Sequence, residues 1–112
     1  MHTPSAARLL ELHFDETDRY QGRPLYEAIV DRARQLHIAG ATVFRGLEGF
    51  GDTAEVHRHR IGRRDQPIVV TIVDTAENLA RLIPELEAML DTGLIATTEV
   101  EAIRIENTEP RM

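Results

Sequence analysis

The sequence contains no cysteine, lysine or tryptophan. Without cysteine the chain cannot form disulfides, thiolate zinc sites or iron–sulfur clusters. Without lysine it cannot form a Schiff base or the phosphate contact of a P-loop lysine. The chain also lacks any run near the roughly 20 apolar residues that span a bilayer, and it begins without the apolar stretch of a signal peptide. We therefore expect a cytoplasmic protein that does not insert into a membrane.

The composition is that of an ordinary soluble domain. Hydrophobic residues make up 42% and charged residues 29% of the 112 residues, which argues against a disordered or fibrous chain. The net charge of -6 excludes a general affinity for nucleic acid, so any anion site must be local. The length predicts one domain over residues 1–112, with an ordered core over about 6–106.

Hydrophobic periodicity predicts three elements in the first half of the chain. Residues 6–14 alternate, with Leu10, Leu12 and Phe14 on one face, as in a strand. Pro24 suits the first turn of a helix whose apolar stripe continues to Gly40, a glycine typical of a helix end. Residues 41–45 are rich in β-formers and predict a second strand, followed by a long loop over 46–66.

The second half predicts a strand, a helix and a last strand. Residues 68–73 are apolar on both faces, which indicates a central strand. Residues 74–77 resemble a capping box that opens a helix ending at Gly93, with a bend at Pro84. Residues 94–106 predict a strand whose apolar face changes between Val100 and Ile103, which indicates a bulge or bend, and the tail 107–112 is expected to fray.

The resulting order β-α-β-β-α-β predicts an α+β, ferredoxin-like fold, in which two helices cover one face of a four-stranded antiparallel sheet. The other face would expose Leu9 together with one apolar face of residues 68–73. An exposed apolar patch of that size favours association, so we expect an oligomer with sheets packed together at its centre.

Five segments carry a resemblance to a known family. They are residues 42–51 (TVFRGLEGFG), 56–57 (VH), 66–74 (QPIVVTIVD), 82–86 (LIPEL) and 93–95 (GLI). In this order they resemble the PII-like family known as domain of unknown function 190. The resemblance implies a homotrimer with ligand clefts between subunits, and a loop over 46–66 that regulates a partner.

The resemblance also implies that this is a non-enzymatic signalling protein. Its candidate ligand is a small anion such as an adenine nucleotide, lying at the base of the loop and against residues 91–98. Its partner would be a membrane transporter or channel, or a metabolic enzyme. PII proteins carry a glycine- and lysine-rich phosphate loop after the second helix, and residues 91–98 (DTGLIATT) depart from that pattern.

The candidate ligand residues combine arginines with glycines. Arginine binds phosphate and carboxylate in a bidentate manner, and glycine lets backbone N–H groups approach an anion. An exposed phenylalanine could stack on a base. The expected set is Arg45, Gly46, Gly49, Phe50, Gly51, Arg58, Arg60 and Gly93. The alternatives are that the glycines only shape a strand exit, that the loop arginines are solvated, and that Arg45 pairs between subunits.

Two further groups of residues bear on the function. In an extended segment His57 and His59 project to the same side, so a trimer that binds a divalent metal is the alternative function, with Glu55 or Asp52 as a third ligand. An acidic cluster at Asp15, Glu16 and Asp18 lacks a nucleophile with a positioned base and is interpreted as a solvated turn rather than a catalytic site.

Overall fold

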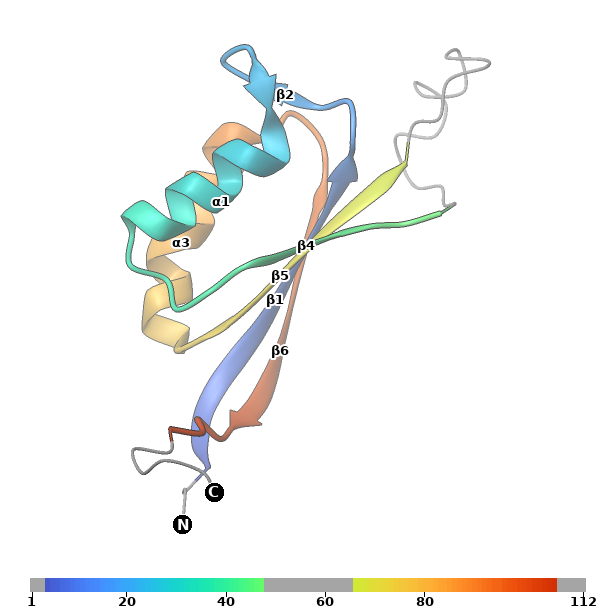
Figure 1. Ribbon diagram of the computed structural model, residues 1–112. Coiled ribbons are helices and arrows are strands. Elements are labelled where there is room, and N and C mark those ends of the chain that lie inside the picture. Colours follow the sequence, from blue (N-terminus) through green and yellow to red (C-terminus); the bar gives the residue numbers. More distant parts are fainter. Residues whose placement is uncertain (1–3, 48–65, 107–112) are drawn as a thin grey trace.

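The computed structural model describes residues 4–47 and 66–106, and its main feature is an antiparallel sheet with two helices on one face (Figure 1). The strand order in the sheet is β4-β5-β1-β6. The bounds are β1 Ser5–Asp15, β4 Thr42–Arg45, β5 Pro67–Asp74 and β6 Leu94–Ala102. The predicted central position of β5 is confirmed, and so is the ferredoxin-like arrangement.

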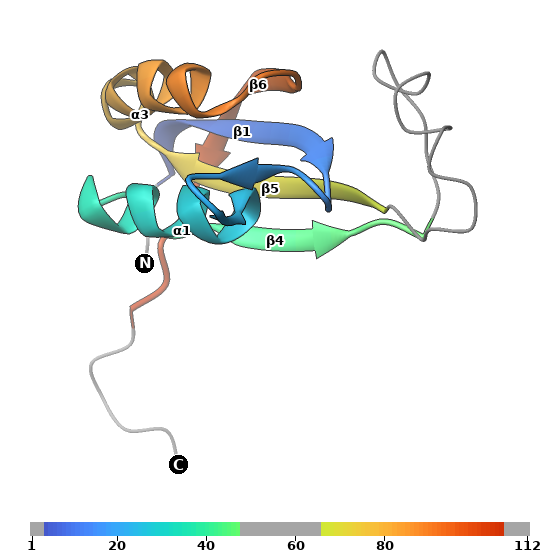
Figure 2. The same ribbon diagram turned by 90° about the horizontal axis from the view of Figure 1, so that it is seen from above.

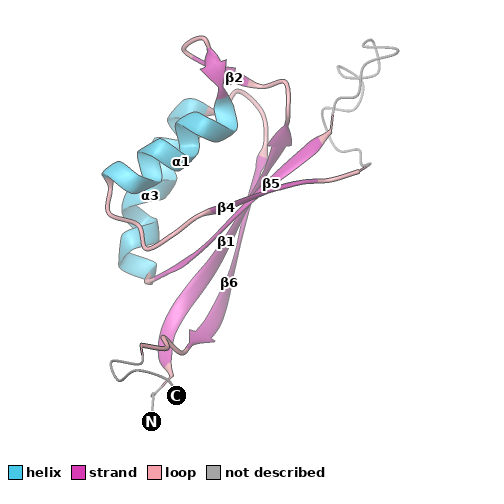
Figure 3. Ribbon diagram, in the orientation of Figure 1, coloured by secondary structure: helices cyan, strands magenta, loops and turns pink. Residues whose placement is uncertain are grey.

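The core lies between the sheet and helices α1 (Leu25–Gln35) and α3 (Ala76–Met89) (Figure 3). The predicted apolar face of β1 is buried, and the alternate residues of β5 lie beside it. An ion pair between Arg32 and Glu85 joins the two helices. The largest fully buried side chains are Leu10, Leu12, Leu25, Ile29, Ile68, Val70, Ile72, Leu79, Leu82 and Leu86.

Helix α1 ends at Gln35 rather than near Gly40, which corrects the sequence prediction. His37 takes the left-handed conformation (φ 61°), and its N–H donates to Arg34 O at 3.0 Å. The N–H of Ile38 donates to Ala33 O, also at 3.0 Å. This pair of bonds is the Schellman motif, in which histidine occupies the position that glycine usually fills.

Helix α3 begins one residue later and ends earlier than predicted. Thr75, not Asp74, is the N-cap, and its side chain accepts from the N–H of Asn78. The helix runs unbroken through Pro84, which lies on its exposed side. It stops at Met89, since Leu90 is extended, so Gly93 belongs to the connection with β6.

A small hairpin precedes α1, between the first strand and the first helix, where the sequence analysis predicts no element. Strand β2 (Arg19–Tyr20) pairs with β3 (Arg23–Pro24), and both turn residues, Gln21 and Gly22, have positive φ. The two strands have two residues each, too short to produce a hydrophobic period. Arg23 connects the hairpin to α1 through Asp31, with Nη2 2.6 Å from Oδ2.

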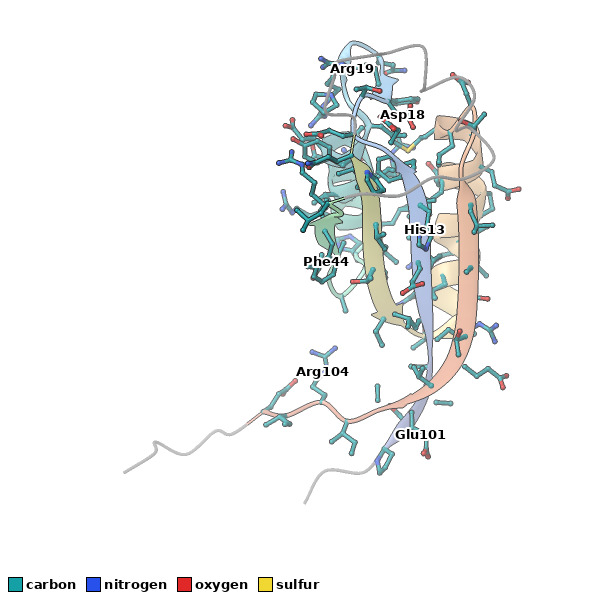
Figure 4. The ribbon with its side chains drawn as sticks, turned by 90° about the vertical axis from the view of Figure 1, so that its right-hand side faces the viewer. His13, Asp18, Arg19, Phe44, Glu101 and Arg104 are labelled. Carbon is teal, nitrogen blue, oxygen red and sulfur yellow. The ribbon has the colours of Figure 1, made fainter. Side chains whose placement is uncertain are left out.

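Strand β6 ends at Ala102 instead of Glu106, and its pairing with β1 contains no bulge. The register is regular from His13↔Leu94 to Ser5↔Ala102. Strand β1 begins at Ser5, whose partner is Ala102, and the chain turns away from the sheet after that pair (Figure 4). The change in apolar face therefore marks the end of the strand.

The face of the sheet opposite the helices carries no other described element, and we call it the open face. Directly paired strand residues share a face. The register therefore assigns to it Leu9, Glu11 and His13 of β1, Val69, Thr71 and Val73 of β5, Thr42 and Phe44 of β4, and Leu94, Ala96 and Thr98 of β6. Figure 4 looks onto this face, with His13 on a central strand and Phe44 near one edge.

Candidate ligand-binding site

The candidate site lies at the end of the sheet where β1 and β4 finish and β5 and β6 begin. Antiparallel pairing places Arg45 beside Ile68 and, two strands away, His13 beside Leu94. Strand β4 ends and β5 begins at this end (Figure 2), and residues 48–65 lie between them in the sequence. The described residues at the roots of this segment therefore set which groups a ligand would meet there.

The guanidinium of Arg45 is held by an acidic side chain of its own chain. Its Nη2 lies 2.6 Å from Oε2 of Glu16, and the two side chains are 53% and 28% exposed. Arg45 is expected to contact an anionic ligand, with a salt bridge between subunits as the alternative. In the described chain the partner is Glu16, and the ligand role of Arg45 stays a prediction.

Glu16 belongs to a turn, as the sequence predicts, and hydrogen bonds within the chain order this turn. The N–H of Glu16 donates to Gln66 O at 2.9 Å. Asp15 Oδ1 accepts from the backbone N–H of Thr17 at 2.9 Å and from its hydroxyl at 2.7 Å. Asp18 Oδ2 accepts from the N–H of Asp15 at 3.0 Å. These bonds fix the backbone beside Arg45 and attach the end of β1 to the start of β5.

Gly46 is required by its close approach to the ring of Pro67. Its N–H donates to Pro67 O at 2.7 Å, which closes the root of segment 48–65. A Cβ at this position would lie 2.7 Å from Cγ of Pro67. The structure thus supplies a packing reason for the glycine, and its predicted contact with a ligand remains untested.

Gly93 is required for a different reason, at the start of β6. Its φ is +156°, and a Cβ there would lie 2.9 Å from the carbonyl oxygen of His13 and 2.5 Å from Cδ2 of Leu90. The last turn before β6 therefore passes tightly over the end of β1. As with Gly46, the predicted ligand contact remains untested.

Arg45 and Gly93 lie at the same end of the sheet but on opposite edges. Strand β4 forms one edge and β6 the other, with β5 and β1 between them. Three strand spacings separate the edges by about 14 Å. Within one chain the fold brings Arg45, Gly46 and Glu16 together and leaves Gly93 apart from them.

The other predicted ligand residues lie outside the described residues. They are Gly49, Phe50, Gly51, Arg58 and Arg60, and the two candidate metal ligands, His57 and His59, fall in the same segment. In residues 4–47 and 66–106, no group of three histidine or carboxylate side chains is arranged to hold a metal. The metal alternative therefore stays a prediction about segment 48–65.

Sequence reasoning missed the partnership of Glu16 with Arg45. The two residues are far apart in the chain, and they meet only because β5 pairs with both β1 and β4. The available signal was an acidic residue directly after the first strand together with an arginine at the end of the second. Register was needed to connect them.

Residues 7–102 match the model of the family DUF190, which is described as an uncharacterized ACR. The chain belongs to the DUF190 family. A UPF0166 protein of Aquifex aeolicus (strain VF5) is 35% identical over 98 residues, covering 86% of this chain and 92% of the relative. A UPF0166 protein of Methanocaldococcus jannaschii is 31% identical over 106 residues, covering 92% and 97%.

Solved structures show that this DUF190 protein has a PII-like fold. CPII, a nitrogen regulatory PII-like protein from Thiomonas intermedia K12 bound to ADP, AMP and bicarbonate, superposes with a TM-score of 0.66 at 12% identity. The match covers 89% of this chain and 98% of CPII. CPII bound to ADP, AMP and acetate gives 0.62 at 17% identity, covering 91% and 93%. In the part of this chain that the structure describes, no helix has the length and apolarity to span a membrane.

Proposed function

We propose that this protein is a cytoplasmic PII-like regulator that binds a small anionic ligand between the subunits of a homotrimer. Adenine nucleotides and bicarbonate are the first ligands to test, because CPII shares the fold and is bound to ADP, AMP and bicarbonate. Segment 46–66 would carry the signal to a membrane transporter or channel, or to a metabolic enzyme. The proposal includes no catalytic step.

The observation that carries the proposal is the placement of Arg45. Its half-exposed guanidinium lies at the end of the sheet, next to Gly46 and at the root of the proposed signalling segment. An arginine fixed at such a position is suited to a phosphate or carboxylate. Ligand bound there would touch the segment whose state it is to control.

The separation of Arg45 from Gly93 supports a site between subunits. A bicarbonate ion cannot reach both edges of one sheet across about 14 Å, and a nucleotide could do so only by lying across the ends of β5 and β1. A site in which the β4 edge of one subunit faces the β6 edge of another would bring both residues to one ligand without that span. We therefore assign Arg45 and Gly46 to one wall of the site and Gly93 to the other, with Gly49, Phe50, Gly51, Arg58 and Arg60 supplied by the segment between β4 and β5.

Thermal unfolding with ADP, AMP and bicarbonate tests this function. A ligand at 100 times its Kd stabilises the folded state by about 2.7 kcal/mol, so we expect at least one of the three to raise the Tm. Arg45→Gln should weaken binding by about tenfold, because it removes a charge-assisted hydrogen bond. Combining Arg58→Ala with Arg60→Ala should also weaken it.

Arg34→Gln is the matched control. Arg34 is 78% exposed on α1, so this variant loses the same charge away from the site and should bind as the wild type does. The proposal is wrong if none of the three compounds shifts the Tm, or if Arg45→Gln and Arg34→Gln bind equally well.

A further inference from the structure

The charge of Arg45 is already paired with Glu16 before any ligand binds. The 2.6 Å contact with Glu16 neutralises the guanidinium in the ligand-free chain. An incoming phosphate or carboxylate must therefore share Arg45 with Glu16 or take its place. Since both groups are anions, they also repel each other.

The backbone of Glu16 is held by the hydrogen bonds of its turn, whereas its partly exposed side chain pairs with Arg45. The N–H of Glu16 is bonded to Gln66 O, and the adjoining turn is closed by bonds to Asp15 and Asp18. The carboxylate stands at the end of a flexible side chain that is 28% exposed. A ligand can consequently displace the carboxylate without unfolding the turn, yet cannot remove it from the neighbourhood.

The strength of the pair suits such an exchange. Partly exposed ion pairs contribute little to stability, equivalent to a factor of about 1.5 to 5 in an equilibrium constant. A pair of this strength positions Arg45 in the empty site and still gives way to a phosphate, which offers bidentate geometry and a larger charge. A neutral ligand gains nothing from displacing Glu16.

We infer that Glu16 is an internal counter-ion that an anionic ligand displaces from Arg45, and that it thereby lowers the affinity of the site for anions. This inference rests on the proposed ligand site. It assigns to Glu16 a specificity role, because the carboxylate opposes charged ligands and leaves uncharged ones unaffected. The displacement of Glu16 from Arg45 would also affect both ends of segment 46–66. Glu16 is bonded to Gln66 at one end, and Arg45 precedes Gly46 at the other.

Calorimetric titration with ADP, AMP and adenosine tests the inference. Glu16→Gln should tighten binding of ADP and AMP by about threefold and leave adenosine unchanged. Glu16→Asp retains the charge but draws the carboxylate back by one methylene, so it should give part of the same gain. Glu99→Gln is the matched control, because Glu99 also pairs with an arginine, Arg8, at 3.6 Å, and lies farther along β6.

The outcomes separate the inference from the function on which it rests. If the wild type binds neither ADP nor AMP, both fail. If the wild type binds them and Glu16→Gln gives no gain, only the role of Glu16 is wrong. An equal gain for adenosine, or one in Glu99→Gln, would also refute it. If Glu16→Gln binds ADP and AMP more tightly and Glu16→Asp does not, the ligand does not displace Glu16 from Arg45. The carboxylate would then oppose anionic ligands only by general charge repulsion. Thermal unfolding of each variant establishes that it is folded.

Discussion

At the scale of single residues, His37 occupies a backbone conformation that side chains other than glycine and asparagine usually avoid. Its φ of 61° is imposed by the two hydrogen bonds that close the end of α1. A left-handed residue with a Cβ costs about 1–2 kcal/mol, and part of that cost should be recoverable by substitution with glycine. The helix end is thus strained at a position remote from the proposed site.

We expect His37→Gly to stabilise the fold by about 0.5–1 kcal/mol, because relief of the strain exceeds the added entropy of glycine in the unfolded chain. Urea unfolding at equilibrium measures the difference. His37→Ala keeps the unfavourable Cβ and is the matched control, which should show no gain. Equal stabilities of the glycine and alanine variants would contradict this account of the helix end.

The same residue explains an error of sequence interpretation. A glycine after an apolar stripe is the usual mark of a helix end, and Gly40 therefore seemed to be the stop. The fold places histidine at the left-handed position instead, four residues after Ala33 and directly before the buried Ile38. The burial of Ile38 fixes where the turn must fall. The helix propensities of the neighbouring residues do not show which apolar residue will be buried.

At the scale of elements, Asp74 connects three parts of the fold at the far end of β5. Its Oδ2 accepts from the N–H of Ala39 at 2.9 Å, in the connection between α1 and β4. Its Oδ1 accepts from the N–H of Thr75 at 2.7 Å and from Nδ2 of Asn78 at 2.8 Å, at the start of α3. Partial burial acts to raise the pKa of Asp74, but these hydrogen bonds from Ala39, Thr75 and Asn78 outweigh it, and the pKa lies below its usual value.

This shift predicts how stability depends on pH. Because the pKa is lower in the folded than in the unfolded state, the ionised carboxylate stabilises the fold above the unfolded pKa of about 3.9. That contribution is lost as the pH falls through the folded pKa. We expect Asp74→Asn to cost about 1–2 kcal/mol near neutral pH and progressively less below about pH 4.

Urea unfolding of the wild type and Asp74→Asn at several pH values measures this difference. Glu77→Gln removes an exposed carboxylate from the same turn of α3 and should change stability by less than about 0.5 kcal/mol. If the cost of Asp74→Asn is as large at the lowest pH as at neutral pH, the stabilising group is not the ionised carboxylate.

The elements that sequence predicted well are those with a strong hydrophobic period. Leu10, Leu12 and Phe14 are buried as expected, and so are Leu79 and Leu82 of α3. The errors occur where pairing decides the outcome. Ile103 and Ile105 continue a strand-like alternation, yet they lie beyond the last residue that β1 can pair.

Strand pairing also limited what the sequence could predict about the candidate site. Arg45 and Gly46 were placed at a strand end by propensity and by resemblance. The distance to Gly93 and the contact with Glu16 required the strand order, which local pattern does not contain.

At the scale of the whole molecule, the open face is more apolar than a solvated sheet face usually is. Val73 is 45%, Phe44 54% and Leu94 60% exposed, and Leu9 and Val69 lie among them. Antiparallel sheets that face water on one side normally alternate apolar with polar residues. Glu11 and His13 also lie on this face, with Nε2 of His13 3.5 Å from Oε1 of Glu11. Contact with further copies would shield the apolar side chains from water, and this is the basis of the proposed trimer.

A negative charge placed on the open face should therefore prevent assembly. Val73→Glu changes a side chain that is already 45% exposed in the single chain, so the monomer should tolerate it. Buried between copies, the new carboxylate would lack a partner, which is strongly unfavourable. Light scattering after size exclusion should give a mass of about 38 kDa for the wild type, three times 12.7 kDa, and a lower mass for the variant.

Ala80→Glu adds the same charge to the exposed side of α3, away from the sheet, and should leave the trimer intact. A wild type that remains monomeric at high concentration would overturn the proposed assembly, and a Val73→Glu variant that still forms trimers would place the contact elsewhere. Ligand binding links this result to the site. If Arg45 and Gly93 act from different subunits, Val73→Glu should lose nucleotide binding as it loses assembly, although its own Arg45 and Gly93 are unchanged.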